Sequence, residues 1–191
     1  MKYKIVSLLI FFFLVGCTQH NLQNESSSLI DYKSIDLNVK ELKIELQEDL
    51  FKGLDEDSAF AKKETYLKLK EWSNQKFRVL GNKNKAILKV IGPEMILKKK
   101  KEKLILKKIL LYNEKIYLIT TKVLLSFIMS EGNSKKIEIS SRIDLSLKDN
   151  MSLNNREIVI QKTIEKLISA IDLEINKMLE KNEFIELVIK K

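Results

Sequence analysis

The chain has 191 residues, a net charge of +9 at pH 7, one cysteine (Cys17) and one histidine (His20). This length suits one domain with its own core. A lone cysteine excludes an intrachain disulfide, and the absence of histidine after residue 20 excludes Ser-His, Cys-His and histidine-based zinc sites from the rest of the chain.

The first sixteen residues have the pattern of a secretory signal peptide. Lys2 and Lys4 precede the apolar run 5–15, and Gly16 is a small residue directly before Cys17. The run is too short for the roughly 20 residues of a membrane span. We predict a signal peptide over 1–16; the alternative is an uncleaved N-terminal anchor with an incidental cysteine.

The tetrapeptide Leu14-Val15-Gly16-Cys17 resembles the lipobox of bacterial lipoproteins. The resemblance implies that the Cys17 thiol carries a diacylglyceryl group, that the new N-terminus is acylated, for example by palmitate, and that the chain is anchored outside the cytoplasm. Thr18 follows in place of Asp, which by the enterobacterial sorting rule indicates the outer membrane, facing the periplasm. A Gram-positive host, whose lipoproteins are tethered to its only membrane, stays open.

The segment that follows Cys17 is polar and has no helical or strand period. We predict a flexible tether over 17–34, in which His20 is a solvated linker residue, and a single α/β domain over 35–191. Removing sixteen residues leaves 175, and the loss of Lys2 and Lys4 lowers the net charge to +7.

Alternation of apolar and polar residues over 35–46 predicts a first strand with a bulge near Lys40 and Glu41. A helix is expected from Asp57 or Ser58 to Leu80, with Gly81 as its C-terminal stop. Five residues share one face of that helix and are expected in the core: Leu69, Trp72, Ser73, Phe77 and Leu80.

Three further strands are predicted. The second begins at 86–90 and is interrupted by Gly92-Pro93, which fits a bulge or a sheet edge. Met95 and Leu97 are candidates for resuming it. The third covers 117–127, with its odd-numbered residues on one buried face. A turn at 130–134 leads to the fourth, 137–147, whose apolar residues alternate with charged ones.

The excess positive charge is concentrated in one segment, residues 98–108, which holds seven lysines against Glu102: Lys98, Lys99, Lys100, Lys101, Lys103, Lys107 and Lys108. One interpretation is a loop that contacts anionic lipid headgroups at a membrane surface. The other is an extended hairpin between the second and third strands.

The last helix is expected to start at an N-cap, Ser152, and to bury the stripe Ile160, Ile164, Leu167, Ile168, Ile171, Ile175, Met178 and Leu179. Residues 183–191 could prolong it or add a short strand. The order β-α-β-β-β-α predicts an α+β fold, a two-layer sandwich in which two helices cover a mainly antiparallel four-stranded sheet.

On a chain with a lipobox, this order of elements resembles the LPS-assembly lipoprotein family of the outer-membrane translocon, and more broadly the auxiliary lipoproteins of ABC-type transporters. The segments 69–81 and 152–157 are similar to a family of small envelope lipoproteins of Gram-negative bacteria. The resemblance implies a non-enzymatic accessory factor with an outer-membrane barrel or a transporter subunit as partner.

Catalytic chemistry has little support in the sequence. Glu41 with Glu45, or Glu138 with Asp144, could share a sheet face as paired acids, but alternating charges on an exposed face usually serve solubility. We therefore expect no enzyme, no metal site, no cofactor and no nucleic-acid partner, and keep a carboxylate-based enzyme as the least favoured alternative.

Overall fold

The computed structural model describes residues 32–47, 55–103 and 112–189, without the side chains of 99–103 and 112–113. The predictions for residues 1–31, including the signal peptide, Cys17 and His20, lie outside the described residues.

The described chain has two main helices and two sheets. Its elements are β1 (Ile35–Leu37), β2 (Leu42–Gln47), α2 (Glu56–Lys76), β3 (Phe77–Val79), β4 (Lys85–Lys103), β5 (Tyr112–Ile128), β6 (Ser134–Lys148), α3 (Leu153–Leu179) and the 3-10 helix η1 (Asn182–Leu187). The larger sheet has the order β2-β4-β5-β6; β2 is parallel to β4, and the other neighbours are antiparallel. The predicted α+β fold is confirmed.

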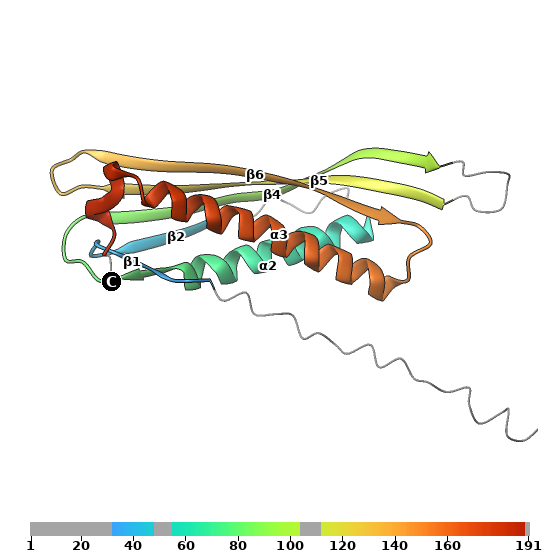
Figure 1. Ribbon diagram of the computed structural model, residues 1–191, viewed down its shortest axis with the longest axis horizontal. Coiled ribbons are helices and arrows are strands. Elements are labelled where there is room, and N and C mark those ends of the chain that lie inside the picture. Colours follow the sequence, from blue (N-terminus) through green and yellow to red (C-terminus); the bar gives the residue numbers. More distant parts are fainter. Residues whose placement is uncertain (1–31, 48–54, 104–111, 190–191) are drawn as a thin grey trace, which may run out of the picture. The chain divides into compact units, whose positions relative to one another are not determined.

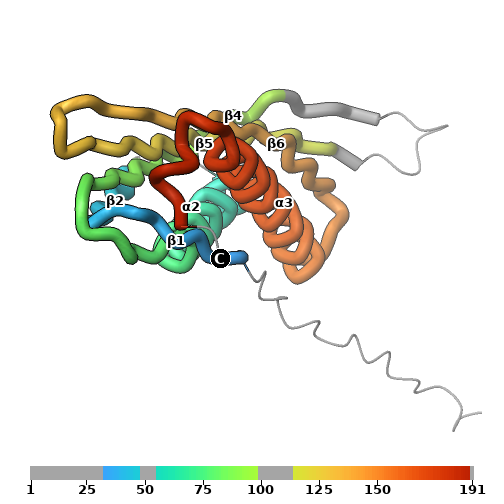
Figure 2. The backbone as a smooth tube through the Cα atoms, turned by 60° about the vertical axis from the view of Figure 1, so that its left-hand side comes forward, coloured from blue at the N-terminus to red at the C-terminus, as the bar shows by residue number. Residues whose placement is uncertain are grey.

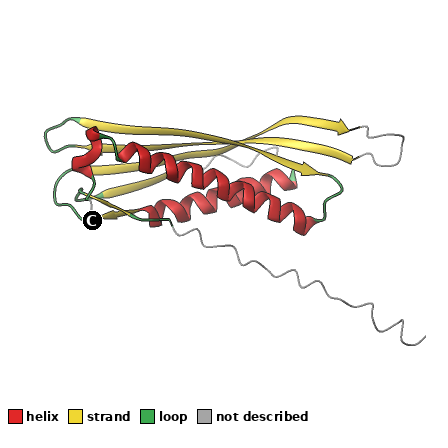
Figure 3. Cartoon of the chain, viewed as in Figure 1, coloured by secondary structure: helices red, strands yellow, loops and turns green. Residues whose placement is uncertain are grey.

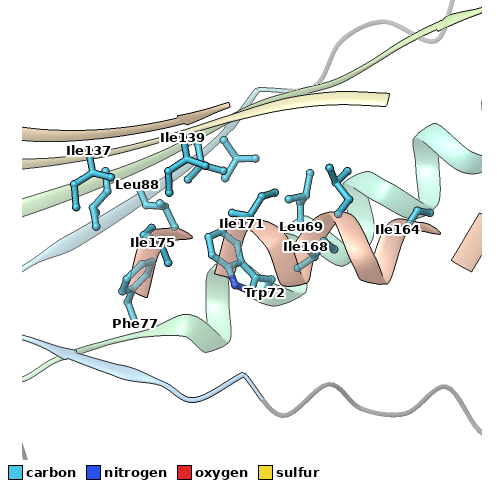
Figure 4. Packing of buried hydrophobic residues seen from close by; sticks show 14 of the residues in the cluster. Leu69, Trp72, Phe77, Leu88, Ile137, Ile139, Ile164, Ile168, Ile171 and Ile175 are labelled. Atoms are coloured by element: carbon cyan, nitrogen blue, oxygen red, sulfur yellow. The ribbon is translucent and has the colours of Figure 1, made fainter. Parts of the chain in front are cut away.

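Both helices lie on the same face of the large sheet, which gives two layers (Figures 1 and 3). The turned view in Figure 2 shows the same layering, with β1 on the helix side. Figure 4 shows Leu69 and Trp72 of α2 and Ile164, Ile168, Ile171 and Ile175 of α3 between the helices and the strands.

The predicted inward faces of the third and fourth strands are confirmed. On β5 the inward row is almost fully buried: Tyr117, Ile119, Thr121, Val123, Leu125 and Phe127. On β6 Ile137, Ile139, Leu145 and Leu147 are buried and Ile143 is half-buried. Ser152 accepts a hydrogen bond from the backbone of Asn155 as the predicted N-cap of α3.

The first predicted strand is wrong in one respect. It is two strands in different sheets, because the backbone leaves β1 at Asn38 and crosses to β2, which pairs with β4. The change of apolar phase near Lys40 and Glu41 marks this crossing and not a bulge. Leu37 and Val39 are fully buried on the way.

The predicted end of the first helix is also wrong. It is capped at Asp55 and ends at Lys76, and residues 77–79 form β3, parallel to β1. Phe77 is buried from the strand, while Leu80 is 59% exposed and outside the core. Gly81 is needed for close packing and not as a helix stop: a Cβ there would lie 2.4 Å from the backbone carbon of Asn38.

The Gly92-Pro93 interruption lies at a register shift in β4, as predicted. β2 pairs with β4 only as far as Ile91, so in the described chain the proline falls where β4 has become an edge strand. Residues 182–187 form a 3-10 helix, and Val188 then makes a single bridge to Leu37. As far as residue 189, where the described chain ends, the C-terminal segment neither prolongs α3 nor forms a full strand.

Candidate functional site

The basic segment continues β4 into a long hairpin with β5. Its backbone pairs run to Lys103 opposite Tyr112, whereas β6 stops pairing with β5 at Lys148 opposite Glu114. Figure 1 shows the two strands continuing past the start of α2. We call residues 98–103 and 112–115 the basic hairpin; it projects beyond the helix layer.

The predicted lysines fall into three groups. Lys98 lies at a register shift, and its ammonium Nζ is 3.1 Å from the carboxylate of Asp144 on β6. Four lie on β4 with their backbones paired to β5, their side chains outside the described residues: Lys99, Lys100, Lys101 and Lys103. Lys107 and Lys108 lie outside the described residues. The hairpin interpretation is confirmed for 98–103.

Sequence reasoning missed Lys115, which the hairpin register places opposite Lys100. It lies outside the continuous lysine run, and only the pairing of β4 with β5 brings it to the same part of the sheet. Because its Nζ is 3.0 Å from the Asp55 carboxylate, it also ties the base of the basic hairpin to α2.

Asp55 joins the base of the hairpin to the helix layer. As N-cap of α2 its side chain accepts from the backbone N–H of Ser58 at 3.0 Å, and its Oδ2 accepts from the Tyr117 hydroxyl at 2.6 Å. Burial alone would raise the pKa of Asp55, but the hydrogen bonds from Ser58, Tyr117 and Lys115 outweigh it and hold that pKa well below its usual range. Burial and Asp55 raise the pKa of Tyr117.

The acids that were considered as catalytic pairs each contact a lysine. Glu41 pairs with Lys85, Glu45 with Lys43, Glu138 with Lys122 and Asp144 with Lys98. Hydrogen bonds from these lysines lower the pKa of Glu41, Glu45 and Glu138. A general acid needs the opposite shift, so these contacts do not favour an acid role at neutral pH.

A groove of about 870 Å³ lies at the C-terminal end of α3, next to residues 33–34, where the chain enters the domain. Its walls come from β1, β3, the end of α3 and the C-terminal segment: Lys33, Ser34, Ile35, Asp36, Arg78, Leu173, Asn176, Leu179, Glu180, Val188 and Ile189. Arg78 closes an ion pair with Asp36 at 2.6 Å across this wall. The lining has no histidine or cysteine.

Two further observations concern only the described residues. No group of three or more His, Cys, Asp or Glu side chains is arranged to hold a metal ion there. Among those same residues, no helix combines the length and the apolar character needed to cross a membrane.

No family model and no curated protein matches the chain. Solved structures of similar arrangement include three bacterial proteins. A neuraminyllactose-binding hemagglutinin homolog from Helicobacter pylori is 11% identical, with 80% of this chain and 91% of that chain covered and a TM-score of 0.34. The minor lipoprotein from Acinetobacter baumannii is 16% identical, with 73% of this chain and 94% of that chain covered and a TM-score of 0.32.

Rare lipoprotein B from Shewanella oneidensis is also 16% identical, with 72% of this chain and 98% of that chain covered and a TM-score of 0.26. The second and third structures are thus lipoproteins of Gram-negative bacteria at low identity. All three TM-scores are below 0.5.

Proposed function

We propose that the protein is a membrane-anchored, non-enzymatic envelope lipoprotein that acts as an accessory factor in outer-membrane or LPS assembly. The lipobox ending at Cys17 carries the proposal. Two or three acyl chains on this residue hold a protein on a membrane stably, since each buried methylene contributes about 0.8 kcal/mol. The domain itself then needs no membrane-spanning segment.

The basic hairpin is the part of the domain that would contact anionic lipid. It brings Lys98–Lys101, Lys103 and Lys115 onto two adjacent strand segments, which start level with the Lys115–Asp55 contact at the end of the helix layer and continue past it. A lysine near an anionic surface contributes about 1 kcal/mol, screened over roughly 8 Å at physiological salt. Several lysines together therefore give a salt-dependent attraction, while the acyl chains supply the permanent attachment.

The hairpin contact is tested by vesicle co-sedimentation of the full chain carrying Cys17→Ser, which has no acyl chain. The hairpin variant is this reference protein with Lys98, Lys99, Lys100 and Lys101 also changed to Ser. The matched control changes four exposed lysines of α3 and its C-terminal end, namely Lys162, Lys166, Lys177 and Lys181. Both variants lose four positive charges, so net charge alone predicts equal effects.

We expect the hairpin variant to bind vesicles with anionic phospholipid at least about tenfold more weakly than the Cys17→Ser reference at low salt, with a smaller difference at high salt. The α3 variant, in the same Cys17→Ser background, should stay within about threefold of the reference. Equal binding by the reference and the hairpin variant, or equal losses in both variants, would remove the basic hairpin from the mechanism.

A second candidate is an auxiliary lipoprotein of an ABC-type lipid transporter, which the same lipobox and order of elements allow. Crosslinking the lipidated protein in its own membranes, followed by pull-down and mass spectrometry, separates the two. Recovery of an outer-membrane barrel supports the assembly factor, and recovery of transporter subunits in another membrane fraction supports the auxiliary role. A carboxylate-based enzyme remains the third alternative.

A further inference from the structure

Strand β6 is an edge of the large sheet. Over its 15 residues it pairs with β5, and within the described chain no other strand borders it. An edge strand presents a row of backbone N–H and C=O groups that another strand can pair with. Which strand can pair with this edge depends on two features of β6: the residues whose backbone N–H and C=O groups point away from β5, and the side chains of those residues.

The turn identifies the outward residues. The backbone N–H of Met129 donates to the carbonyl of Asn133 at 2.8 Å, so this is a hydrogen-bonded pair. Hydrogen-bonded and non-bonded pairs alternate along an antiparallel ladder. From the register Ile128 opposite Ser134, the odd-numbered residues of β6 bond to β5, and the even-numbered residues direct their N–H and C=O to the open edge.

The even-numbered side chains of β6 form a charge pattern in which positive residues would face negative ones if a second copy of the strand ran antiparallel beside the first. They lie on the exposed face in the order Lys136, Glu138, Ser140, Arg142, Asp144. Two copies of β6 running antiparallel about Ser140 place Lys136 opposite Asp144 and Glu138 opposite Arg142. On the inner face the same register places Ile137 opposite Ile143.

We propose that β6 is the docking edge for a second copy of this chain, paired antiparallel about a two-fold axis at Ser140. Even residues then oppose even residues, as the outward hydrogen-bonding groups require. Because residues of the same face are paired, the helices of both copies lie on one side of a continuous sheet.

Neighbouring registers are disfavoured by charge. Moving the centre of symmetry to residue 139 places Lys136 opposite Arg142, and moving it to residue 141 places Glu138 opposite Asp144. Like charges directly opposite each other destabilise a strand pair. A shift that opposes even with odd residues would put the exposed row of one strand on the helix side of the other.

The ion pairs within one chain are compatible with this docking. Glu138 is 2.9 Å from Lys122 and 3.6 Å from Lys136, and Asp144 is 3.1 Å from Lys98, each of these side chains being at least 44% exposed. An ionised carboxylate has about four lone-pair sites on its two oxygens, so each of these acids can accept from a further cation. Arg142 is exposed, and among the described residues its guanidinium forms no side-chain hydrogen bond or ion pair.

Disulfide trapping of the full chain in detergent tests the register. In the proposed pair the two Ser140 Cα atoms are about 5.5 Å apart, within the range of about 4.4–6.8 Å that a disulfide spans. Ser146 is the matched control on the same strand and face, because it opposes Ser134 of the second copy and lies roughly 40 Å from the other Ser146.

We expect Ser140→Cys to give a reducible dimer on mild oxidation, and Ser146→Cys to give no more dimer than the wild type, which reports any contribution of Cys17. A folded Ser140→Cys protein without dimer, or equal dimer from both variants, would overturn the proposal. Pairing of β6 with a different protein is then the remaining use of this edge.

A charge exchange tests the same contact without cysteine. Arg142→Glu places glutamates opposite each other twice in the dimer and should weaken self-association about tenfold or more, measured by analytical ultracentrifugation. Adding Glu138→Arg restores opposite charges across the axis and should recover association to within about threefold of wild type. Failure of this recovery, with both variants folded by circular dichroism, would contradict the assigned register.

Discussion

Lys76 is a charged side chain with no exposed surface, and its partners explain how α2 tolerates it. Its ammonium donates to the carbonyl of Lys33 at 3.0 Å and to Asn176 at 2.9 Å, and it is 2.8 Å from the carboxylate of Asp172. Trp72 donates to the same carboxylate. The network connects α2, α3 and the segment by which the chain enters the domain.

Replacing Lys76 with Met should lower the free energy of unfolding by roughly 3 kcal/mol, because Asp172 stays largely buried without its cation. Burial lowers the pKa of Lys76, and the hydrogen bond and charge of Asp172 oppose that shift. Urea unfolding measures the difference. Lys68→Met is the control, since the Lys68–Glu71 pair is about one-third exposed and should contribute at most about 0.5 kcal/mol. Equal losses would contradict the network.

Asp55 gives a prediction about pH. Its pKa in the folded state lies below the ordinary value of 3.8, so between the two values the unfolded chain binds more protons. Its contribution is therefore fully present above about pH 4 and is lost as pH falls through the folded pKa. Asp55→Asn keeps a capping oxygen but loses the charge that pairs with Lys115.

At pH 7 we expect Asp55→Asn to be less stable than wild type by about 1 kcal/mol, with the gap closing as pH is lowered from 4 toward 2. Thermal unfolding across this range checks it. Asp149→Asn, at an exposed turn residue, provides the comparison. A gap that stays constant with pH would show that the ionised carboxylate does not stabilise this cap.

Residue-scale contacts of this kind were not predictable from the sequence. The partners of Trp72 and Tyr117 are 100 and 62 positions away along the chain. Periodicity places both aromatic side chains on core faces but does not indicate that either polar atom meets an aspartate there.

At the scale of elements, long regular patterns were predicted well. Strand β6 alternates over its 15 residues, β5 alternates from Tyr117 to Phe127, and α3 repeats one apolar stripe from Ile160 to Leu179, so a single local rule determines their buried faces. The short elements were not. Phe77 and Leu80 continue the helical spacing of α2, and only the pairing of β3 with β1 reveals that the helix has ended.

The packing of β1 against β3 depends on the absence of a side chain at Gly81. A methyl group there would overlap the backbone of Asn38, where the chain leaves β1. Gly81→Ala should therefore cost about 2 kcal/mol or more in unfolding free energy, by forcing β1 away from β3.

Gly132→Ala is the comparison for that change. Gly132 has φ +89° and open space around it, so alanine there should cost only about 1 kcal/mol from backbone conformation. Chemical denaturation of both variants separates the two causes. Equal costs would show that the close contact at Gly81 relaxes freely.

At the scale of the molecule, the sequence predicted the two layers and identified the residues of the basic segment, but it did not predict where that segment lies in the fold. Lysine clustering is visible in the printed sequence, whereas the projection of the hairpin follows from where β6 and α2 stop. The open edge of β6 could not be identified either, since strand order in a sheet depends on pairing between distant segments. The charge pattern on that edge is in the sequence, but it has meaning only once the edge is known.

Attachment through a lipidated Cys17 can be measured by intact-mass spectrometry of the full-length protein purified from its own membranes. We predict a chain that begins at residue 17 and carries the mass of a diacylglyceryl group, with or without a further acyl chain, and the loss of both features in Cys17→Ser. An unmodified chain that retains residues 1–16 would contradict the lipoprotein assignment and, with it, the proposed accessory role.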